Sequence, residues 1–199
     1  MVTRKGTTRA SILEASVDLF GSRGFSAVSL DDIAAVVGVA KQTVLYWFPS
    51  KDELLEAVLE QTAIELAAVI EAAVRSAPDE PLARVEAVIK AVLRPAVRRP
   101  ALLGLVREVS RLSPEHAERL TTQVQPFVRR AIDYLAQEMQ AGRLRTADPG
   151  LVVALSYATV TGIATEPTAL RAVEWEATTA GLRRLRSELT EFLLAALRP

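Results

Sequence analysis

The sequence contains no cysteine and only one histidine among 199 residues. Without cysteine there is no disulfide bond, no thiolate metal ligand and no cysteine nucleophile. A single histidine also argues against a zinc site, because such sites combine several imidazole or thiolate ligands. We therefore expect neither a bound metal nor a cofactor.

Long hydrophobic runs are absent as well. The longest nearly apolar stretch, residues 151–164, is too short to span a bilayer and is interrupted by serine and threonine. Near the N-terminus, Glu14 and Asp18 interrupt any apolar region of a signal peptide. The sequence predicts a cytoplasmic protein with no membrane partner.

The chain also lacks an excess of charge of either sign. Its 24 basic residues balance 24 acidic ones, so any binding to nucleic acid must depend on local charge. Within residues 1–51, six basic side chains stand against four acidic ones, which leaves a local charge of +2. This excess is modest, and it permits contact with phosphate groups.

Hydrophobic residues make up half of the chain, and they recur with the period of an α-helix. The prolines lie at helix boundaries, where a missing amide costs little. Residues 151–165 are rich in valine and threonine and locally suit a strand. We nevertheless expect a helix there, because Ala154, Ala158 and Gly162 recur at four-residue spacing, which lets a second helix approach closely.

These patterns predict an all-α fold. The first helix ends before Gly24, where a left-handed residue is expected. The other helices are predicted at 30–37, 40–48, 50–74, 82–97, 100–112, 113–141, 148–165 and 173–197, and Glu166-Pro167 is expected to end the one before last. We expect two domains, a small helical one at residues 1–49 and a larger one at residues 50–199.

Residues 30–51 have the layout of a helix-turn-helix, in which the second helix enters the major groove of DNA. Ala34 is small where the two helices would cross. Gly38 suits a positive φ, which costs about 1 kcal/mol or more in a residue with a Cβ. The apolar side chains expected to lock the two helices together are those of Ile33, Val37, Val39 and Val44.

Polar side chains are predicted on the outer face of the second helix. Gln42 can make a bidentate contact with an adenine edge, and Lys41 can reach guanine acceptors or a phosphate. Other groups are expected to meet phosphate oxygens and so to set the register on the duplex. These are the first-turn amides at Ser29, the hydroxyl groups of Thr43 and Tyr46, and the ammonium group of Lys51.

A larger set of residues in the first quarter of the chain stands in a specific order and spacing. The set comprises Arg9, Ile12, Leu13, Phe20, Gly24, Ile33, Ala34, Gly38, Val39, Thr43, Phe48, Lys51 and Leu54. In this register the sequence resembles the N-terminal domain of TetR-family transcriptional regulators. The resemblance implies a homodimer that binds a near-palindromic operator in double-stranded DNA, and we expect a ligand-responsive repressor.

The same resemblance implies functions for the C-terminal domain. An unidentified small-molecule effector would bind among polar and aromatic residues on its helices, although buried core tyrosines are commoner than ligand contacts. The candidates for this pocket are Arg107, Phe127, Tyr134, Tyr157 and Thr161. The dimer interface implied by the family would use Ala154, Ala158, Gly162, Leu182, Leu185, Leu189 and Phe192.

The sequence departs from the family pattern at three DNA-facing positions. Ala40 and Leu45 stand where relatives commonly carry a hydroxyl, so two phosphate contacts implied by the family are weakened here. Gln42 replaces a small residue and adds a base contact. His116, at the start of a predicted helix, is expected to be solvated rather than to bind a ligand.

Two other classes of protein are alternatives to a DNA-binding regulator. A helical protein-interaction module would use residues 41–47 to meet a protein instead of DNA. An enzyme is not expected, because no nucleophile with a base and no phosphate-binding loop is present. The glycines at 21 and 24 have the wrong spacing for a dinucleotide-binding fingerprint.

Overall fold

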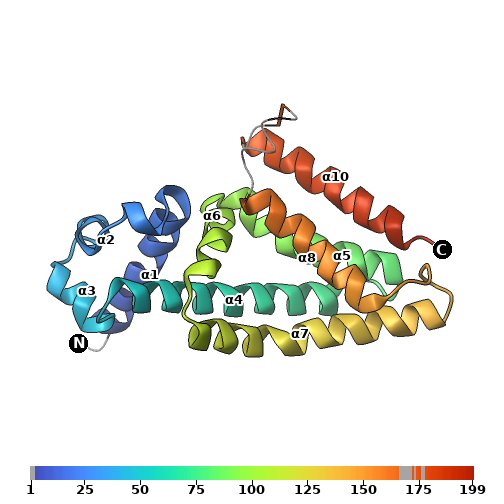
Figure 1. Ribbon diagram of the computed structural model, residues 1–199, viewed down its shortest axis with the longest axis horizontal. Coiled ribbons are helices and arrows are strands. Elements are labelled where there is room, and N and C mark those ends of the chain that lie inside the picture. The colour runs from blue at the N-terminus through green and yellow to red at the C-terminus, as the bar shows by residue number, and fades with distance from the viewer. Residues whose placement is uncertain (1–2, 166–171, 173, 176–177) are drawn as a thin grey trace. The chain divides into compact units, whose positions relative to one another are not determined.

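Figure 1 shows the computed structural model, which describes residues 3–165, 172, 174–175 and 178–199. All regular elements in these residues are helices, as the hydrophobic period predicts. Within this part of the chain no helix is long and apolar enough to cross a membrane. In chain order the elements are α1 (Thr3–Arg23), η1 (Phe25–Ala27), α2 (Leu30–Val37), α3 (Lys41–Trp47), α4 (Lys51–Ser76), α5 (Pro81–Arg98), α6 (Ala101–Glu108), η2 (Val109–Arg111), α7 (Pro114–Gln140), α8 (Pro149–Thr165) and α10 (Thr179–Leu197).

Most observed boundaries follow the capping and proline signals. The expectation that the prolines mark boundaries is wrong for Pro95 and Pro126, which lie inside α5 and α7. Helix α8 confirms that the valine- and threonine-rich segment is helical. The predicted stop at Glu166-Pro167 and the predicted start at Val173 lie outside the described residues. The described part of α10 begins after Thr178, whose hydroxyl oxygen accepts a hydrogen bond from the amide of Gly181 at 3.0 Å.

The contacts divide the chain into two compact units. Unit 1 comprises Met1–Ala63 and Arg99–Leu120, and unit 2 comprises Ile64–Arg98 and Thr121–Pro199. Helices α4 and α7 each contribute residues to both units. Helix α6 therefore belongs to the unit that also contains α1, α2 and α3.

Unit 1 has the larger continuous core. Phe20, Ile12, Ile33 and Leu54 are completely buried in it and come from three different helices. Helix α6 crosses α1 at a pair of glycines, Gly21 and Gly104. A Cβ added to Gly21 would lie 2.0 Å from the carbonyl oxygen of Ala101, so the two backbones touch with no room for a side chain.

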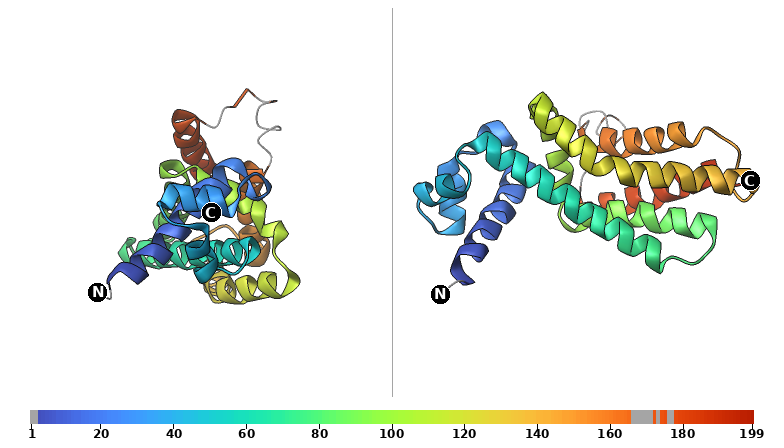
Figure 2. Two further views of the ribbon diagram at one scale, coloured as in Figure 1. Left: turned by 90° about the vertical axis from the view of Figure 1, so that its left-hand side faces the viewer. Right: turned by 90° about the horizontal axis from the view of Figure 1, so that it is seen from below.

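Unit 2 has a smaller core at the end of α7, where Leu135 and Met139 pack against Leu144 and Leu197. In this unit α10 packs along α5 (Figure 2). The amide and the guanidinium group of Arg145 donate hydrogen bonds to the carbonyl oxygens of Leu197 and Ala196, at 3.0 and 2.7 Å. These bonds hold the end of α10 against the loop that follows α7.

A bidentate ion pair closes that loop. The guanidinium group of Arg143 donates to both carboxylate oxygens of Glu138, at 2.5 and 2.9 Å. The hydrogen bonds from Arg143 lower the pKa of Glu138 against the opposing effect of burial. Gly142, at φ 68°, makes the turn that brings the two side chains together.

The glycine crossing in unit 1 gives a stability prediction. Gly21→Ala forces a methyl group into the backbone of α6, and we expect it to lower the free energy of unfolding by about 1–3 kcal/mol. Ser22→Ala is the matched control, because Ser22 is the exposed neighbour in the same helix. Urea unfolding followed by circular dichroism measures both variants. Equal stability of the two would contradict the close crossing.

Candidate nucleic-acid interface

Helix α2 begins at a complete capping box. The backbone amide of Ser29 donates to a carboxylate oxygen of Asp32 at 2.7 Å, and the Asp32 amide donates back to the Ser29 hydroxyl oxygen at 3.1 Å. The hydrogen bonds from the side chain and then the backbone of Ser29 lower the pKa of Asp32. The first turn also contains Asp31, so this helix end carries two carboxylates.

The turn between α2 and α3 depends on Gly38. This residue has φ 75° and ψ 35°, the left-handed conformation expected from the sequence. Its neighbour Val39 donates its amide to the carbonyl oxygen of Ala34 at 3.0 Å, which closes the end of α2. Ile33, Ala34 and Val44 are buried directly around this turn, so the angle between the two helices is set by packing.

Helix α3 has two distinct faces. Val44 is fully buried and Phe48, which ends the helix, is 4% exposed, so one face is part of the unit 1 core. Lys41 and Gln42 are exposed on the outside, and 69% of the surface of Tyr46 is accessible. The outward face is therefore polar and aromatic, and it stands on a rigid apolar base.

The ammonium group of Lys41 lies against an acidic side chain of the preceding helix. Its Nζ donates to a carboxylate oxygen of Asp31 at 2.8 Å. The two side chains are 48% and 65% exposed, so the pair is a surface ion pair that is worth about 0.2–1 kcal/mol. The sequence alone does not reveal Asp31 as a partner of Lys41, because the contact depends on how α2 and α3 cross.

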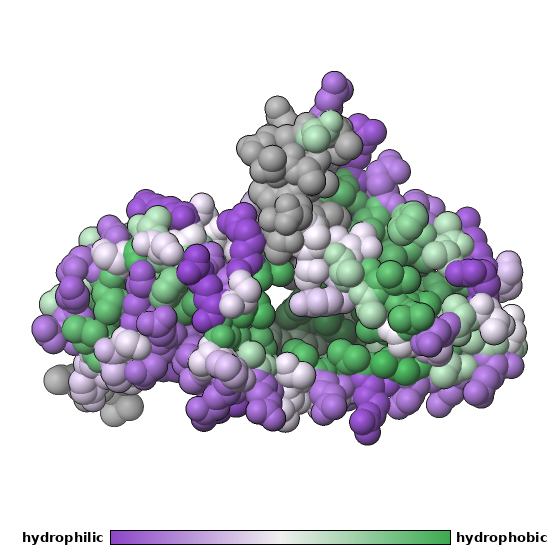
Figure 3. All heavy atoms as spheres, viewed as in Figure 1, coloured by the Kyte–Doolittle hydropathy of each residue, from purple (hydrophilic) through white to green (hydrophobic). Residues whose placement is uncertain are grey.

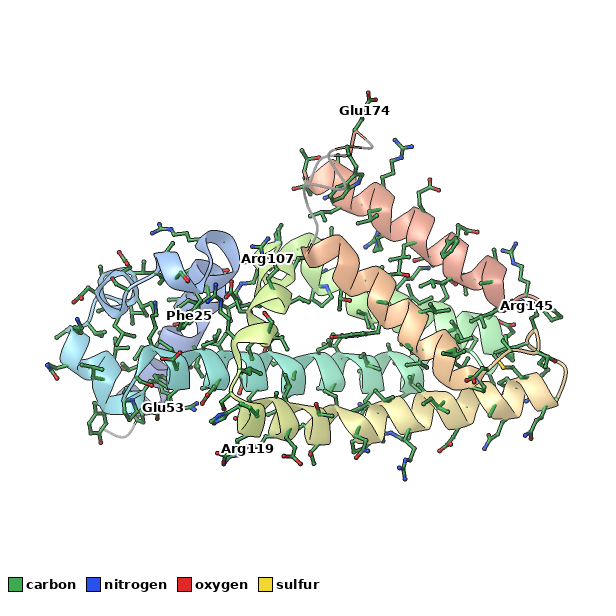
Figure 4. The ribbon with its side chains drawn as sticks, in the orientation of Figure 1. Phe25, Glu53, Arg107, Arg119, Arg145 and Glu174 are labelled. Carbon is green, nitrogen blue, oxygen red and sulfur yellow. The ribbon has the colours of Figure 1, made fainter. Side chains whose placement is uncertain are left out.

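Lys51 is occupied inside the protein. Its Nζ donates to the carbonyl oxygens of Phe25 and Val28, at 3.0 and 2.9 Å. The same atom lies 4.1 Å above the centroid of the Phe25 ring (Phe25 is labelled in Figure 4), and the Arg111 guanidinium lies 5.9 Å from that centroid. Lys51 thus ties the start of α4 to the segment before α2.

The comparisons with known proteins agree with this geometry. Residues 12–58 match the family model described as "Bacterial regulatory proteins, tetR family". The chain is 25% identical over 164 residues to the HTH-type transcriptional regulator EthR of Mycolicibacterium smegmatis, and the match covers 82% of this chain and 74% of EthR.

Residues 12–58 belong to the tetR family of bacterial regulatory proteins.

Of two further relatives, one is similar only over a short segment, and the other is similar over nearly the complete fold. The HTH-type transcriptional regulator RutR of Escherichia coli K12 is 45% identical over 53 residues, which is 27% of this chain and 25% of RutR. A solved structure of a TetR/AcrR-family regulator from Thermobifida fusca YX-ER1 is 25% identical, with a TM-score of 0.68 over 96% of this chain and 98% of that one. This protein is thus a DNA-binding transcriptional regulator with an N-terminal tetR-family domain, and its described residues form an all-α fold.

The structure brings most of the expected DNA-contacting residues of the regulator to one region. Lys41, Gln42 and Tyr46 are exposed, as is Ala40 at the start of α3, whereas Thr43 and Leu45 are half-buried. The remaining two expected contacts already have partners within unit 1: the hydroxyl and amide of Ser29 bond to Asp32, and Lys51 bonds to two carbonyl groups.

The residues expected around an effector do not share one environment. Phe127, Tyr134 and Thr161 are half-buried in unit 2, and burial raises the pKa of Tyr134. The Arg84 guanidinium lies over the Tyr134 ring, 5.3 Å from its centroid. Two other candidates lie in different surroundings. These are Tyr157, which is 66% exposed on α8, and Arg107, which is exposed on α6 in unit 1 (labelled in Figure 4).

The residues expected at a dimer interface also divide into two groups. On α8, Ala154 and Ala158 are exposed and Gly162 is half-buried. On α10, Phe192 is 65% exposed and Leu185 is half-buried. Leu182 and Leu189 are only 3% and 5% exposed, so they are buried within this chain.

His116 is also less exposed than the sequence suggested. Its Nδ1 is 2.7 Å from the hydroxyl oxygen of Ser113, and its Nε2 is 2.8 Å from a carboxylate oxygen of Glu56. Burial raises the pKa of Glu56, and the neighbouring His116 partly opposes this. The contact fastens the first turn of α7 to α4 inside unit 1. In the described part of the chain, no group of three or more acidic, histidine or cysteine residues is arranged to hold a metal ion.

The bonds of Lys51 give a second stability prediction. Lys51→Met removes a charged donor from two part-buried carbonyl groups, and we expect a loss of about 1.5–3 kcal/mol in the free energy of unfolding. Lys41→Met removes only an exposed ion pair and should cost less than about 1 kcal/mol. Urea unfolding compares the two lysines directly. A smaller loss at position 51 than at position 41 would contradict the structural role.

Proposed function

We propose that this regulator is a ligand-responsive repressor that binds a near-palindromic operator as a homodimer. Residues 1–49 would read DNA, and residues 50–199 would carry the effector and dimer functions. Such a regulator works in the cytoplasm, beside the chromosome. These domains differ from the two compact units of the structure. Unit 1 extends to Ala63 and also includes residues 99–120, because α6 packs on α1.

The observation that supports DNA reading most directly is the division of α3 into a buried and an exposed face. Because Val44 and Phe48 fix the helix on the core, Lys41 and Gln42 are held outward with a defined direction. Gln42 would then contact an adenine edge, and Lys41 a guanine or a phosphate. Tyr46 and Thr43 would bind phosphate oxygens and set the register.

The small size of the proposed DNA-reading domain, residues 1–49, favours a dimer. One short helix in one groove reads few base pairs, so two units would dock in successive major grooves about 34–36 Å apart. Helix α8 supports a dimer, because Leu151 and Leu155 are 61% and 66% exposed beside Ala154 and Ala158. Figure 3 shows hydrophobic side chains on the face of unit 2 where α8 lies. An exposed apolar face of this kind is typical of a protein interface.

An effector in unit 2 would act on DNA binding through the helices that contribute to both units. Helix α4 is continuous from Lys51 to Ser76 and leaves unit 1 at Ala63. A coupling free energy of about 1–3 kcal/mol between the two sites would lower operator affinity roughly 5- to 150-fold. The half-buried Phe127, Tyr134 and Thr161 are the pocket residues that this proposal retains.

Selection from a random pool of double-stranded DNA at near-physiological salt tests the whole proposal. We expect the purified protein to enrich a near-palindrome with two half-sites about one helical turn apart. Binding should also weaken steeply as salt rises, because phosphate contacts release counterions. The alternative is a protein-interaction module. It would be favoured if the folded, dimeric protein enriched no DNA and instead bound another partner at high salt.

Gln42 offers a test of base reading. Gln42→Ala should relax the base preference at one position in each half-site, with a loss of about 1–3 kcal/mol of discrimination there. Tyr46→Phe is the control, because removal of a phosphate-binding hydroxyl should weaken all sequences alike. Selected motifs compared between the three proteins measure this. The same motif for wild type and Gln42→Ala would rule out the base contact.

The exposed face of α8 offers a test of the dimer. Ala158→Glu places a charge in the centre of that face, and we expect the protein to become monomeric. Ala131→Glu makes the same change at an exposed position of α7, outside the proposed interface, and should leave the dimer intact. Light scattering coupled to size-exclusion chromatography gives the mass of each. A dimeric Ala158→Glu variant would place the interface elsewhere.

A further inference from the structure

The helix-turn-helix itself is not positively charged. Between Leu30 and Trp47 it contains two carboxylates, Asp31 and Asp32, and one cation, Lys41, so its formal charge is −1. Asp32 is committed to the capping box at Ser29. Lys41 is therefore the single cation of the helix-turn-helix, and its partner matters most for contact with DNA.

That cation is held by an acid on the neighbouring helix. Lys41 is the first residue of α3, and its Nζ donates to Asp31 Oδ2, in the first turn of α2, at 2.8 Å. Asp31 and Lys41 are ten positions apart, so only the crossing of α2 and α3 brings them together. Both side chains remain largely exposed, so neither is locked in place by packing.

We propose that Asp31 is a positioning residue that restrains Lys41 and thereby subtracts one phosphate contact per subunit from binding to DNA of unrelated sequence. The inference rests on the proposed DNA contact of Lys41. In a complex with non-specific DNA, the ammonium group of Lys41 would exchange the carboxylate of Asp31 for a phosphate, so it would only replace one anionic partner by another. The exchange also leaves the carboxylate of Asp31 unpaired beside the negative backbone of the DNA.

At a matched operator the balance is different. The base contact of Gln42 and the phosphate contacts of its neighbours hold α3 in the groove, so the DNA acceptor is presented to Lys41 at high effective concentration. Lys41 then leaves Asp31 and contributes to binding. Asp31 thus raises the ratio of specific to non-specific affinity without touching a base.

The salt dependence of binding to a random-sequence duplex tests this directly. A plot of the logarithm of the association constant against the logarithm of the salt concentration is linear, and its slope changes by about 0.9 for each phosphate contact. We expect Asp31→Asn to steepen the slope on random DNA by about 1.8 for the dimer, because one Lys41 in each of the two subunits is released to bind a phosphate. Asp31→Glu keeps the carboxylate and should match wild type. A slope for Asp31→Asn equal to that of wild type overturns the proposal.

A double-mutant cycle shows whether Asp31 acts through Lys41. On random DNA, Lys41→Ala alone should leave the slope unchanged, and adding Asp31→Asn to it should change nothing further. If the Asp31→Asn effect persists without the lysine, Asp31 acts as a bulk negative charge, and the proposal is wrong. Thermal melting by circular dichroism confirms that all variants are folded, since an exposed pair contributes little to stability.

The selected operator separates this proposal from the proposed contact of Lys41. On that site Lys41→Ala should make the slope shallower by about 1.8 for the dimer, and Asp31→Asn should leave it unchanged, because both Lys41 side chains are already on the DNA. If Lys41→Ala has no effect there while Asp31→Asn steepens the slope on random DNA, the operator contact fails and the restraint by Asp31 stands.

Discussion

The reading surface depends on the burial of the inner faces of two very short helices. Helices α2 and α3 contain eight and seven residues, and helices of that length are not stable alone in water. Ile33, Ala34, Val44 and Phe48 anchor them in the core of unit 1. Because this core fixes the backbone of α3, its outward side chains are offered to DNA in one orientation, which direct reading of bases requires.

Polar contacts around this core set the ends of the elements. The capping box at Ser29 starts α2, Gly38 makes the turn, and Lys51 joins the start of α4 to the carbonyl groups before α2. These contacts also decide which charges remain for DNA. Of the basic groups near α3, Lys51 is bonded to carbonyl groups of the fold, and Lys41 is paired with Asp31. The surface is therefore less cationic than a list of its residues indicates.

Much of the architecture was predictable because its signals are local. The helix boundaries at Ser29, Gly38 and Pro149 follow from capping, positive φ and the missing proline amide, and each acts within a few residues. The helical state of α8 followed from the spacing of Ala154, Ala158 and Gly162 against a local preference for a strand. The positions of Leu182 and Leu189 were not predictable, because an apolar stripe on α10 is equally suited to its own chain or to a second subunit.

The sequence by itself determined the all-α fold, the helix-turn-helix and the family, because hydrophobic period, caps and residue spacing are properties of short segments. Only the tertiary structure decided which partners the charged side chains have. Lys51 meets Phe25 and Val28 across more than twenty positions, Lys41 meets Asp31, and His116 meets Glu56. A side chain's partner depends on how helices cross, and the crossings are set by packing of the whole core.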